Sequence, residues 1–203
     1  TPGALVEAVN LVLSPQLSCS YARAGMLSAD GRCKFLDSRA NGYVRGEGSS
    51  TALVCPISGI GGAPSACLAG SCVWQDGRSA SLTAPNGQAQ GAMVLSALSR
   101  AGGDIGGLRL VEAHGTGTAL GDPTELAALL RNLSKVAKAH EGQIGRACIS
   151  GVKANFGHLE PAAGLGGCVR ALHNLWRGHC AGNAQLRVLN TLIGRSIQGS
   201  DAQ

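Results

Sequence analysis

Two consecutive segments of the chain each predict a strand, then a glycine-containing loop with one histidine, then a helix. In the first, the apolar residues 108–113 precede the loop around His114, and a helix follows with leucines three and four positions apart. In the second, residues 147–152 precede the loop around His158, and a helix with small residues in its first turns opens at Pro161. Strand–loop–helix units in succession predict an α/β layered fold in which helices pack on a mixed sheet.

The two loop histidines are candidate site residues because of where each one stands. In α/β folds ligands bind at the carboxyl ends of strands, and both His114 and His158 follow a predicted strand and precede a predicted helix. The partial positive charge at a helix N-terminus favours a neutral imidazole, which can donate a hydrogen bond to an oxygen that gains negative charge. The alternative is a loop histidine satisfied by backbone groups. The hypothesis therefore depends on whether both loops belong to one site.

Three charged side chains accompany the histidines. Asp122 can cap the helix after the first loop, Pro123 suits its first position, and Glu125 stands where a capping box has its acid. Lys153 directly follows an apolar strand, so its ammonium lies near a buried end and requires a partner. Glu125 is the candidate for that partner.

The rest of the chain predicts shorter elements on either side of a loop-rich region. Residues 4–13 are expected to form a buried strand that ends at the following Ser-Pro pair. Glycine, aspartate, arginine and serine with little periodicity predict an ordered, loop-rich region over residues 28–50. Residues 51–57 and 66–73 are strand candidates, and residues 88–101 have helical spacing.

Composition limits the classes of partner. Glycine makes up 31 of 203 residues, twice the ~7% average, and no G-X-Y period accompanies it, so the chain is not collagen-like. The net charge is +5, but the basic residues are scattered and aromatic residues make up only 3%, unlike a nucleic-acid interface. An acidic protein partner or a phosphate-bearing substrate fits this charge better. No apolar run approaches the ~20 residues that span a bilayer, so we expect no membrane segment.

The eight cysteines include no CxxC pair and no His/Cys cluster at ligand spacing, so we expect no metal site. Four of them have apolar neighbours, where a reduced cysteine acts as a small hydrophobe: Cys55, Cys72, Cys148 and Cys168. This pattern favours a reducing compartment and predicts a cytoplasmic protein. The sequence also lacks a P-loop and a GxSxG elbow, and no cysteine stands in an activating setting.

The HGTGT loop with its following GDPTE, and KANFGH further on, resemble in order and spacing the two histidine motifs of the β-ketoacyl synthase (ketosynthase) family. Four other segments resemble parts of that family in the correct order: LVEAVNLVLSP, GRCKFLDSRANGYVRGEG, WQDGRSASLTAPNGQAQ and NAQLRVLN. The stretch from QDGRS to LTAPNG is similar to the multidomain, type I polyketide synthase branch. The resemblance implies a thiolase-like fold, in which residues 1–45 end the N-terminal half and residues 46–203 form much of the C-terminal half.

The resemblance also implies an acyltransferase activity. Members of the family catalyse a decarboxylative Claisen condensation between an acyl thioester, loaded on a cysteine, and malonyl carried by an acyl carrier protein. By matching position, His114 and His158 would stabilise the enolate. Lys153 would orient the site through an ion pair with Glu125, and Asp122 would support the loop.

Substrate contacts and partners are implied in the same way. Thr116 and Thr118 would hold the pantetheine arm by their hydroxyls, and the phosphopantetheine would arrive on the acyl carrier protein rather than as a bound cofactor. A homodimer through the ketosynthase fold is also implied. The nucleophilic cysteine motif of the family and its C-terminal glycine-rich loop have no counterpart in this sequence, so we expect the chain alone not to condense.

Other interpretations stay open at this point. One is a non-catalytic partner that keeps the ketosynthase fold and shapes a heterodimer cavity, and another is a fatty-acid β-ketoacyl synthase. A truncated product that does not fold independently is a third. The presence of both histidines together with Lys153 favours the enzyme.

Overall fold

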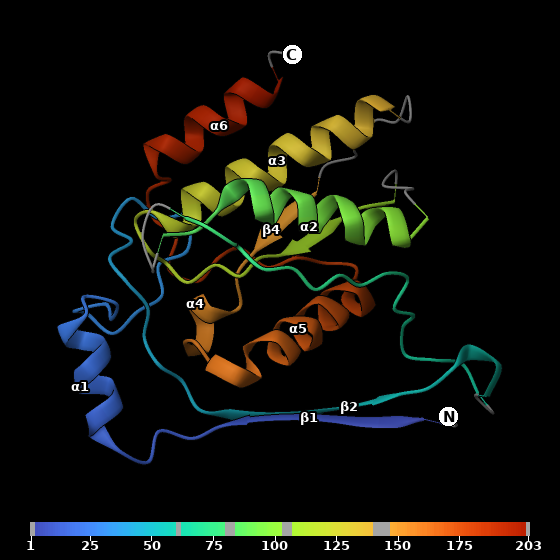
Figure 1. Cartoon of the computed structure of the whole chain (residues 1–203), viewed down its shortest axis with the longest axis horizontal. Helices are drawn as coiled ribbons and strands as arrows, with labels where there is room; N and C mark the ends of the chain where they lie inside the picture. Colours follow the sequence, from blue (N-terminus) through green and yellow to red (C-terminus); the bar gives the residue numbers. More distant parts are fainter. Residues whose placement is uncertain (1–2, 60–61, 80–83, 103–106, 140–146, 202–203) are drawn as a thin grey trace.

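The computed structural model describes residues 3–59, 62–79, 84–102, 107–139 and 147–201 (Figure 1). Its strands are β1 (Ala4–Asn10), β2 (Gly48–Val54), β3 (Leu110–Glu112) and β4 (Cys148–Ser150). Its helices are α1 (Pro15–Arg23), α2 (Gly87–Arg100), α3 (Gly121–Ala139), α4 (Lys153–Phe156), α5 (Ala163–Arg177) and α6 (Thr191–Asp201), with the 3-10 turns η1 (Ile57–Gly59) and η2 (Glu160–Ala162). None of the helices in these ranges is long and apolar enough to cross a membrane.

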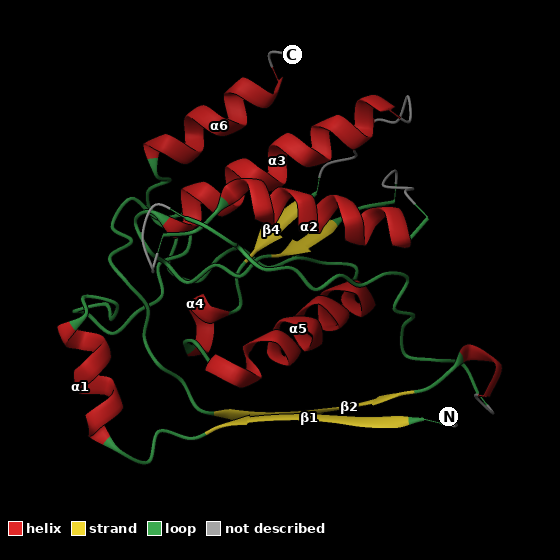
Figure 2. Ribbon diagram, viewed as in Figure 1, coloured by secondary structure: helices red, strands yellow, loops and turns green. Residues whose placement is uncertain are grey.

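The elements form alternating layers of strands and helices (Figure 1, Figure 2). Helix α5 lies between the β1–β2 ribbon and the β3–β4 pair, and contacts β2 on one side and β3 on the other. Helices α2 and α3 pack together on the far side of β3–β4, and α6 packs on α3. This is the α/β layered arrangement that the sequence predicts.

The described strands form two separate pairs, and the second pair positions the site. β1 runs antiparallel to β2, with Ala4 opposite Val54. β3 runs parallel to β4, and Glu112 lies opposite Ser150 at the carboxyl ends of both strands. Because parallel strands end at the same edge, the two segments that lead to the histidines leave this edge side by side.

A small buried core lies under this edge. It joins the loop-rich region to α3 and α6 through four side chains: Phe35, Leu36, Leu126 and Ile193. The ring of Phe35 packs closely on two glycines, since a Cβ added at Gly115 or Gly151 would approach it to 3.0 or 2.6 Å. Glycine at both positions therefore lets the loop after β3 and the turn after β4 close on one aromatic ring.

Two predicted elements are confirmed. Helix α2 covers residues 88–101 except the last. The loop-rich region from residue 28 is ordered as expected up to the start of β2. Asp37, which is fully buried, accepts hydrogen bonds from the backbone N–H groups of Arg187 (2.6 Å) and Val188 (3.0 Å). These bonds attach the loop region to the segment before α6.

Residues 4–13 form a strand that is shorter and more exposed than predicted. β1 ends at Asn10, and the Leu5 side chain is 70% exposed. In the described part of the chain, α5 and η2 cover only one side of the β1–β2 ribbon. The apolar side chains of β1 on the other side therefore stay exposed. The Ser-Pro pair expected to end the strand instead starts a helix, because Ser14 caps α1 and Pro15 takes its first position.

The two other strand candidates have different outcomes. Residues 51–57 lie partly in β2, which begins earlier, at Gly48. Residues 66–73 do not form a strand, and that prediction is wrong. Gly70 packs against the end of α2, where an added Cβ would lie 2.6 Å from the Ala97 carbonyl oxygen. The neighbour of this segment is a helix end, which offers no strand to pair with.

The expectation of buried, reduced cysteines is wrong in part. Cys148 and Cys180 form a disulfide that joins the start of β4 to the segment after α5. Cys168 is exposed on α5, and Cys55 and Cys72 are only half-buried. Residues adjacent in sequence point to different faces of a strand or helix, so apolar neighbours along the chain do not determine burial.

Candidate active site

The two loop histidines converge. The ring centroids of His114 and His158 lie 5.5 Å apart with their planes at 84°, an edge-to-face contact. The ring of Tyr43, which belongs to the loop-rich region, packs on the His158 ring with 5.2 Å between their centroids. The two histidine loops therefore lie side by side, as the hypothesis of a common site requires.

A hydrogen bond to the imidazole of His158 sets its tautomer. Its Nδ1 accepts a hydrogen bond from the backbone N–H of Glu160 at 2.9 Å, so the neutral ring carries its proton on Nε2. Burial lowers the pKa of His158 to about 4, and the charges of Lys153 and His114 act in the same direction. Nε2 has no hydrogen-bond partner among the residues that the structure describes. A neutral ring with a free N–H is therefore available to donate.

The backbone of His114 is held from both sides. Its N–H donates to Glu125 Oε1 at 2.6 Å, and the next N–H, of Gly115, donates to Oε2 at 3.0 Å. Its carbonyl oxygen accepts from Lys153 Nζ. The ring reaches the surface of the chain, but the protein packed around its other side lowers its pKa, and the Lys153 ammonium adds to this. His114 is therefore also neutral near pH 7.

Lys153 and Glu125 do not form the expected ion pair in the described part of the chain. Both bind the backbone of His114 instead: Glu125 accepts its N–H, and Lys153 donates to its carbonyl oxygen. Lys153 is buried, and burial lowers the pKa of its ammonium, while the carboxylates of Glu125 and Glu112 oppose that shift. The physical effect is similar to that of an ion pair, because both charges fix the loop.

The prediction that Asp122 and Glu125 form a capping box at the start of α3 is wrong. The N–H of Gly121 donates to Thr118 Oγ1 at 3.1 Å, so Thr118 caps the helix. Asp122 is buried and accepts from the N–H groups of Gly117 and Leu36, both at 3.1 Å. Burial raises the pKa of Asp122 to about 6. Both carboxylates at this turn thus bind loop backbone rather than the helix end.

Of the two threonines expected to hold a pantetheine arm, one has its hydroxyl engaged in this cap. Thr118 Oγ1 accepts the Gly121 N–H, and it can still donate. The half-buried Thr116 makes no side-chain hydrogen bond with the described residues. Its hydroxyl is free to bind a polar ligand.

Glu112 fixes the start of the segment that carries Lys153. Its Oε1 accepts the Val152 N–H at 2.6 Å, and its Oε2 accepts the hydroxyl of Ser150 at 2.5 Å. Sequence reasoning missed this residue and also Arg45, whose Nε lies 2.5 Å from Glu160 Oε1. The local sequence carries no signal for these contacts, since their partners lie far along the chain.

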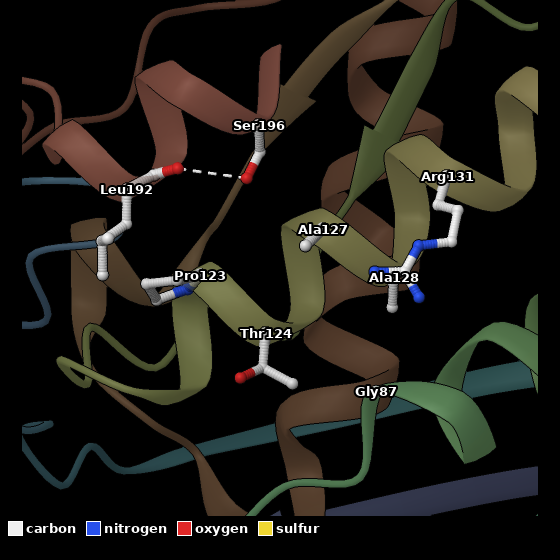
Figure 3. A pocket seen from close by; sticks show the side chains of 8 residues that line it. All are labelled: Gly87, Pro123, Thr124, Ala127, Ala128, Arg131, Leu192 and Ser196. Carbon is white, nitrogen blue, oxygen red and sulfur yellow. Dashed lines mark hydrogen bonds between the residues drawn. The ribbon is translucent and has the colours of Figure 1, made fainter. Parts of the chain in front are cut away.

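A groove of about 390 Å³ lies elsewhere, between α3 and α6 (Figure 3). Pro123, Thr124 and Arg131 line it from α3, and Leu192 and Ser196 from α6. The hydroxyl of Ser196 donates to the Leu192 carbonyl oxygen within its own helix. Neither histidine lines this groove, so it is separate from the candidate site.

The paired histidines lie in a thiolase-like α/β fold, and comparison with known proteins gives the family. Models of the beta-ketoacyl synthase N-terminal and C-terminal domains match residues 3–58 and 65–187. The chain belongs to the beta-ketoacyl synthase family.

Several relatives are polyketide synthases. A phenolphthiocerol/phthiocerol polyketide synthase of Mycobacterium tuberculosis is 43% identical over 179 residues, which are 87% of this chain and 8% of that protein. Polyketide synthase ThaG of Burkholderia thailandensis is 42% identical over 178 residues, 86% of this chain and 3% of that protein. The chain thus spans less than a tenth of these curated relatives.

Solved ketosynthases share the fold. The ketosynthase from module 6 of the bacillaene synthase of Bacillus subtilis has a TM-score of 0.86 at 32% identity, over 94% of this chain and 34% of that one. The oxazolomycin ketosynthase domain OzmH KS7 of Streptomyces albus has a TM-score of 0.87 at 32% identity, over 95% and 34%. The chain has the thiolase-like α/β fold and spans about a third of each solved ketosynthase.

Proposed function

We propose that this chain supplies the enolate-stabilising part of a polyketide ketosynthase, an acyltransferase that condenses an acyl thioester with malonyl on an acyl carrier protein. One observation carries the proposal: two neutral imidazoles meet at one edge of the fold, and Nε2–H of His158 is free to donate. Preorganised donors of this kind stabilise an oxygen that gains negative charge in the transition state.

In the proposed reaction, decarboxylation comes first. The bond between the α-carbon and the carboxylate of the malonyl thioester breaks, carbon dioxide leaves, and the electron pair moves onto the thioester oxygen. His158 donates its Nε2–H to that oxygen, and His114 approaches the same position from the other loop. The α-carbon of the enolate then attacks the carbonyl carbon of an acyl-cysteine. A carbon–carbon bond forms, and the cysteine leaves as its thiolate.

The acyl-carrying cysteine of this proposal is not among the eight of this chain. Cys33 lies close enough to the site for the charges of Lys153 and Asp122 to act on its thiol. It is 1% exposed, and burial raises the pKa of its thiol, so it stays protonated and inaccessible. Cys33 is therefore not the acyl-carrying residue, and the proposal places the acyl chain on a cysteine outside this chain.

The remaining roles belong to the same proposal. Lys153, Glu125 and Asp122 bind the backbone of the His114 loop, which supports a role in holding it in place. Thr116 and Thr118 would bind the pantetheine arm by their hydroxyls. Phosphopantetheine enters on the acyl carrier protein. The net charge of +5 suits that carrier, which is acidic and bears a phosphate. A homodimer and a cytoplasmic location belong to the same proposal.

Substitution of His158 tests the proposal in a complete ketosynthase that carries this chain. His158→Ala removes one donor and is expected to lower the rate of β-ketoacyl formation about 100- to 1000-fold. His173→Ala, the same change at an exposed histidine of α5, is the matched control and is expected to leave the rate unchanged. Mass spectrometry of the carrier-bound product measures both. Near-normal condensation in the His158 variant would remove this residue from the mechanism.

A further inference from the structure

Glu160 contacts the imidazole of His158 through its backbone rather than its side chain. Its N–H is the donor to Nδ1, at 2.9 Å. The peptide reaches this position because Glu160 has φ = 47°, in the left-handed region that a non-glycine residue rarely adopts. Such a conformation persists only where surrounding contacts hold it.

Arg45 supplies those contacts. Its Nε and a terminal nitrogen bind the two oxygens of the Glu160 carboxylate at 2.5 and 3.0 Å, a bidentate pair whose side chains are 7% and 17% exposed. The same guanidinium donates to Ser18 Oγ at 2.9 Å and lies 5.5 Å from the centroid of the Tyr21 ring. The pair lowers the pKa of Glu160, so its carboxylate stays charged. We call the Arg45–Glu160 pair the clamp, and its Arg45 end is held by Ser18 and Tyr21 of α1.

The segment that carries Arg45 also holds the backbone of His158. The His158 N–H donates to the Val44 carbonyl oxygen at 2.8 Å, and the Gly46 N–H donates to the His158 carbonyl oxygen at 2.9 Å. One short segment thus positions the main chain of His158 directly and its imidazole through Glu160. No part of this clamp needs to contact the substrate.

We propose that Arg45 and Glu160 are positioning residues that keep the proton of neutral His158 on Nε2, where it can be donated. The inference rests on the proposed function for its catalytic meaning, but the tautomer itself is a property of the chain. Without the clamp, the Glu160 peptide can leave its left-handed conformation and Nδ1 loses its donor. The ring then populates both tautomers, and a share of the molecules presents a lone pair to the enolate oxygen.

Nitrogen NMR of the chain with 15N-labelled histidine tests the proposal directly. In the unsubstituted chain near pH 7, His158 is expected to show a pyridine-like Nδ1 and a pyrrole-like Nε2. In Arg45→Met and Glu160→Gln, both nitrogens are expected to move toward intermediate, averaged shifts. Arg39→Met breaks another arginine–carboxylate pair, with Asp37, and is expected to leave the His158 signals unchanged. Unchanged shifts in the Arg45 and Glu160 variants would overturn the inference.

A second variant guards against loss of folding. Glu160→Gly removes the carboxylate while tolerating the left-handed backbone, so the fold is expected to survive with the clamp absent. Because glycine adopts the left-handed conformation without the clamp, Glu160→Gly is expected to keep the Nε2–H tautomer, unlike Glu160→Gln, and averaged shifts in this variant would contradict the proposal. Circular dichroism melting confirms that each variant is folded before the comparison is made.

Kinetics in a complete ketosynthase separate this inference from the proposed function. Loss of the clamp in Arg45→Met or Glu160→Gln, the two clamp variants, is expected to lower kcat for decarboxylation about 10- to 100-fold, with little change in KM for the malonyl carrier. If His158→Ala abolishes condensation while the clamp variants keep both their tautomer and their kcat, the inference fails and the function stands. If the clamp variants change the tautomer but His158→Ala condenses normally, the proposed function fails and the positioning role stands.

Discussion

The imidazoles of His114 and His158 meet edge to face, 5.5 Å between centroids, although each follows a different strand. Burial is the main cause that lowers the pKa of both rings, and the same ammonium, that of Lys153, adds to it. One buried cation thus acts on both imidazoles and also holds one of their loops. The shared charge gives a direct way to test the geometry of the site.

Replacement of Lys153 by methionine is expected to raise the pKa of both histidines. Removal of the positive charge makes protonation of each ring easier, so the pKa of His158 moves from about 4 toward its ordinary 6.5. Burial keeps it below that value. NMR titration of the ring protons measures both shifts. Lys135→Met, at an exposed position on α3, is the control and should change neither. An unchanged His158 titration in Lys153→Met would show that the ammonium does not face the site.

The pH dependence of unfolding is expected to carry the signature of His158. Its folded pKa lies below its unfolded value, so the unfolded state takes up a proton between pH 6.5 and about 4 that the folded state does not. Its contribution to stability is present above pH 6.5 and is lost as the pH falls through 4, by about 3 kcal/mol at most.

Urea unfolding at pH 7 and pH 4.5 measures this loss, with His158→Phe as the reference. Phenylalanine keeps the ring against Tyr43 but does not titrate, so the variant should lose less stability on acidification. Asp122 titrates with the opposite sign, because its raised pKa favours the folded state below that value. It is present in both proteins and cancels in the difference. Equal losses in the two proteins would contradict the prediction.

Gly117 and Gly164 form a pair with opposite expectations on substitution by alanine. Gly117 has φ = 78°, and an added Cβ would lie 2.4 Å from the backbone nitrogen of Lys34. Gly117→Ala is expected to lower the free energy of unfolding by about 1–3 kcal/mol. Gly164 lies exposed in α5 with no atom within 4 Å of an added Cβ. Gly164→Ala is expected to raise the free energy of unfolding by about 0.5–1 kcal/mol. Denaturant midpoints test both signs.

The disulfide between Cys148 and Cys180 predicts a thiol count. Six cysteines are free, so a denatured, unreduced sample should show six thiols, rising to eight after reduction. Reduction is expected to lower the free energy of unfolding by about 3–4 kcal/mol, because the bond closes a loop with a sequence separation of 32. In Cys180→Ser a reductant should have no such effect. Eight thiols without reduction would show that the bond does not form.

The sequence predicts the parts of the site that depend on local pattern. Each histidine follows an apolar strand, and parallel strands end at the same edge, so the meeting of His114 and His158 could be anticipated. Pattern also predicts α2 and the helix after the first loop. It cannot assign Asp122 and Glu125, because a carboxylate beside a helix start can bind either the helix end or a neighbouring loop.

Long-range partners explain the remaining errors. Arg45 and Glu160 are far apart in the chain, and no periodicity relates them. Residues 66–73 have the composition of a strand, but a strand also needs a neighbour to pair with, and this segment lies beside the end of α2. The Ser-Pro pair before α1 fits both a strand end and a helix start. The folded structure decides between the two, since Ser14 caps α1 there.

Phe35 limits how closely the two histidine-bearing segments can approach each other. Its ring packs directly on the backbone of Gly115 and of Gly151, with no side chain of either glycine between them. A methyl group on either glycine would force them apart, and a smaller residue in place of the ring would leave a void. Any redesign of the distance between the imidazoles would have to start from these three positions, none of which takes part in the chemistry.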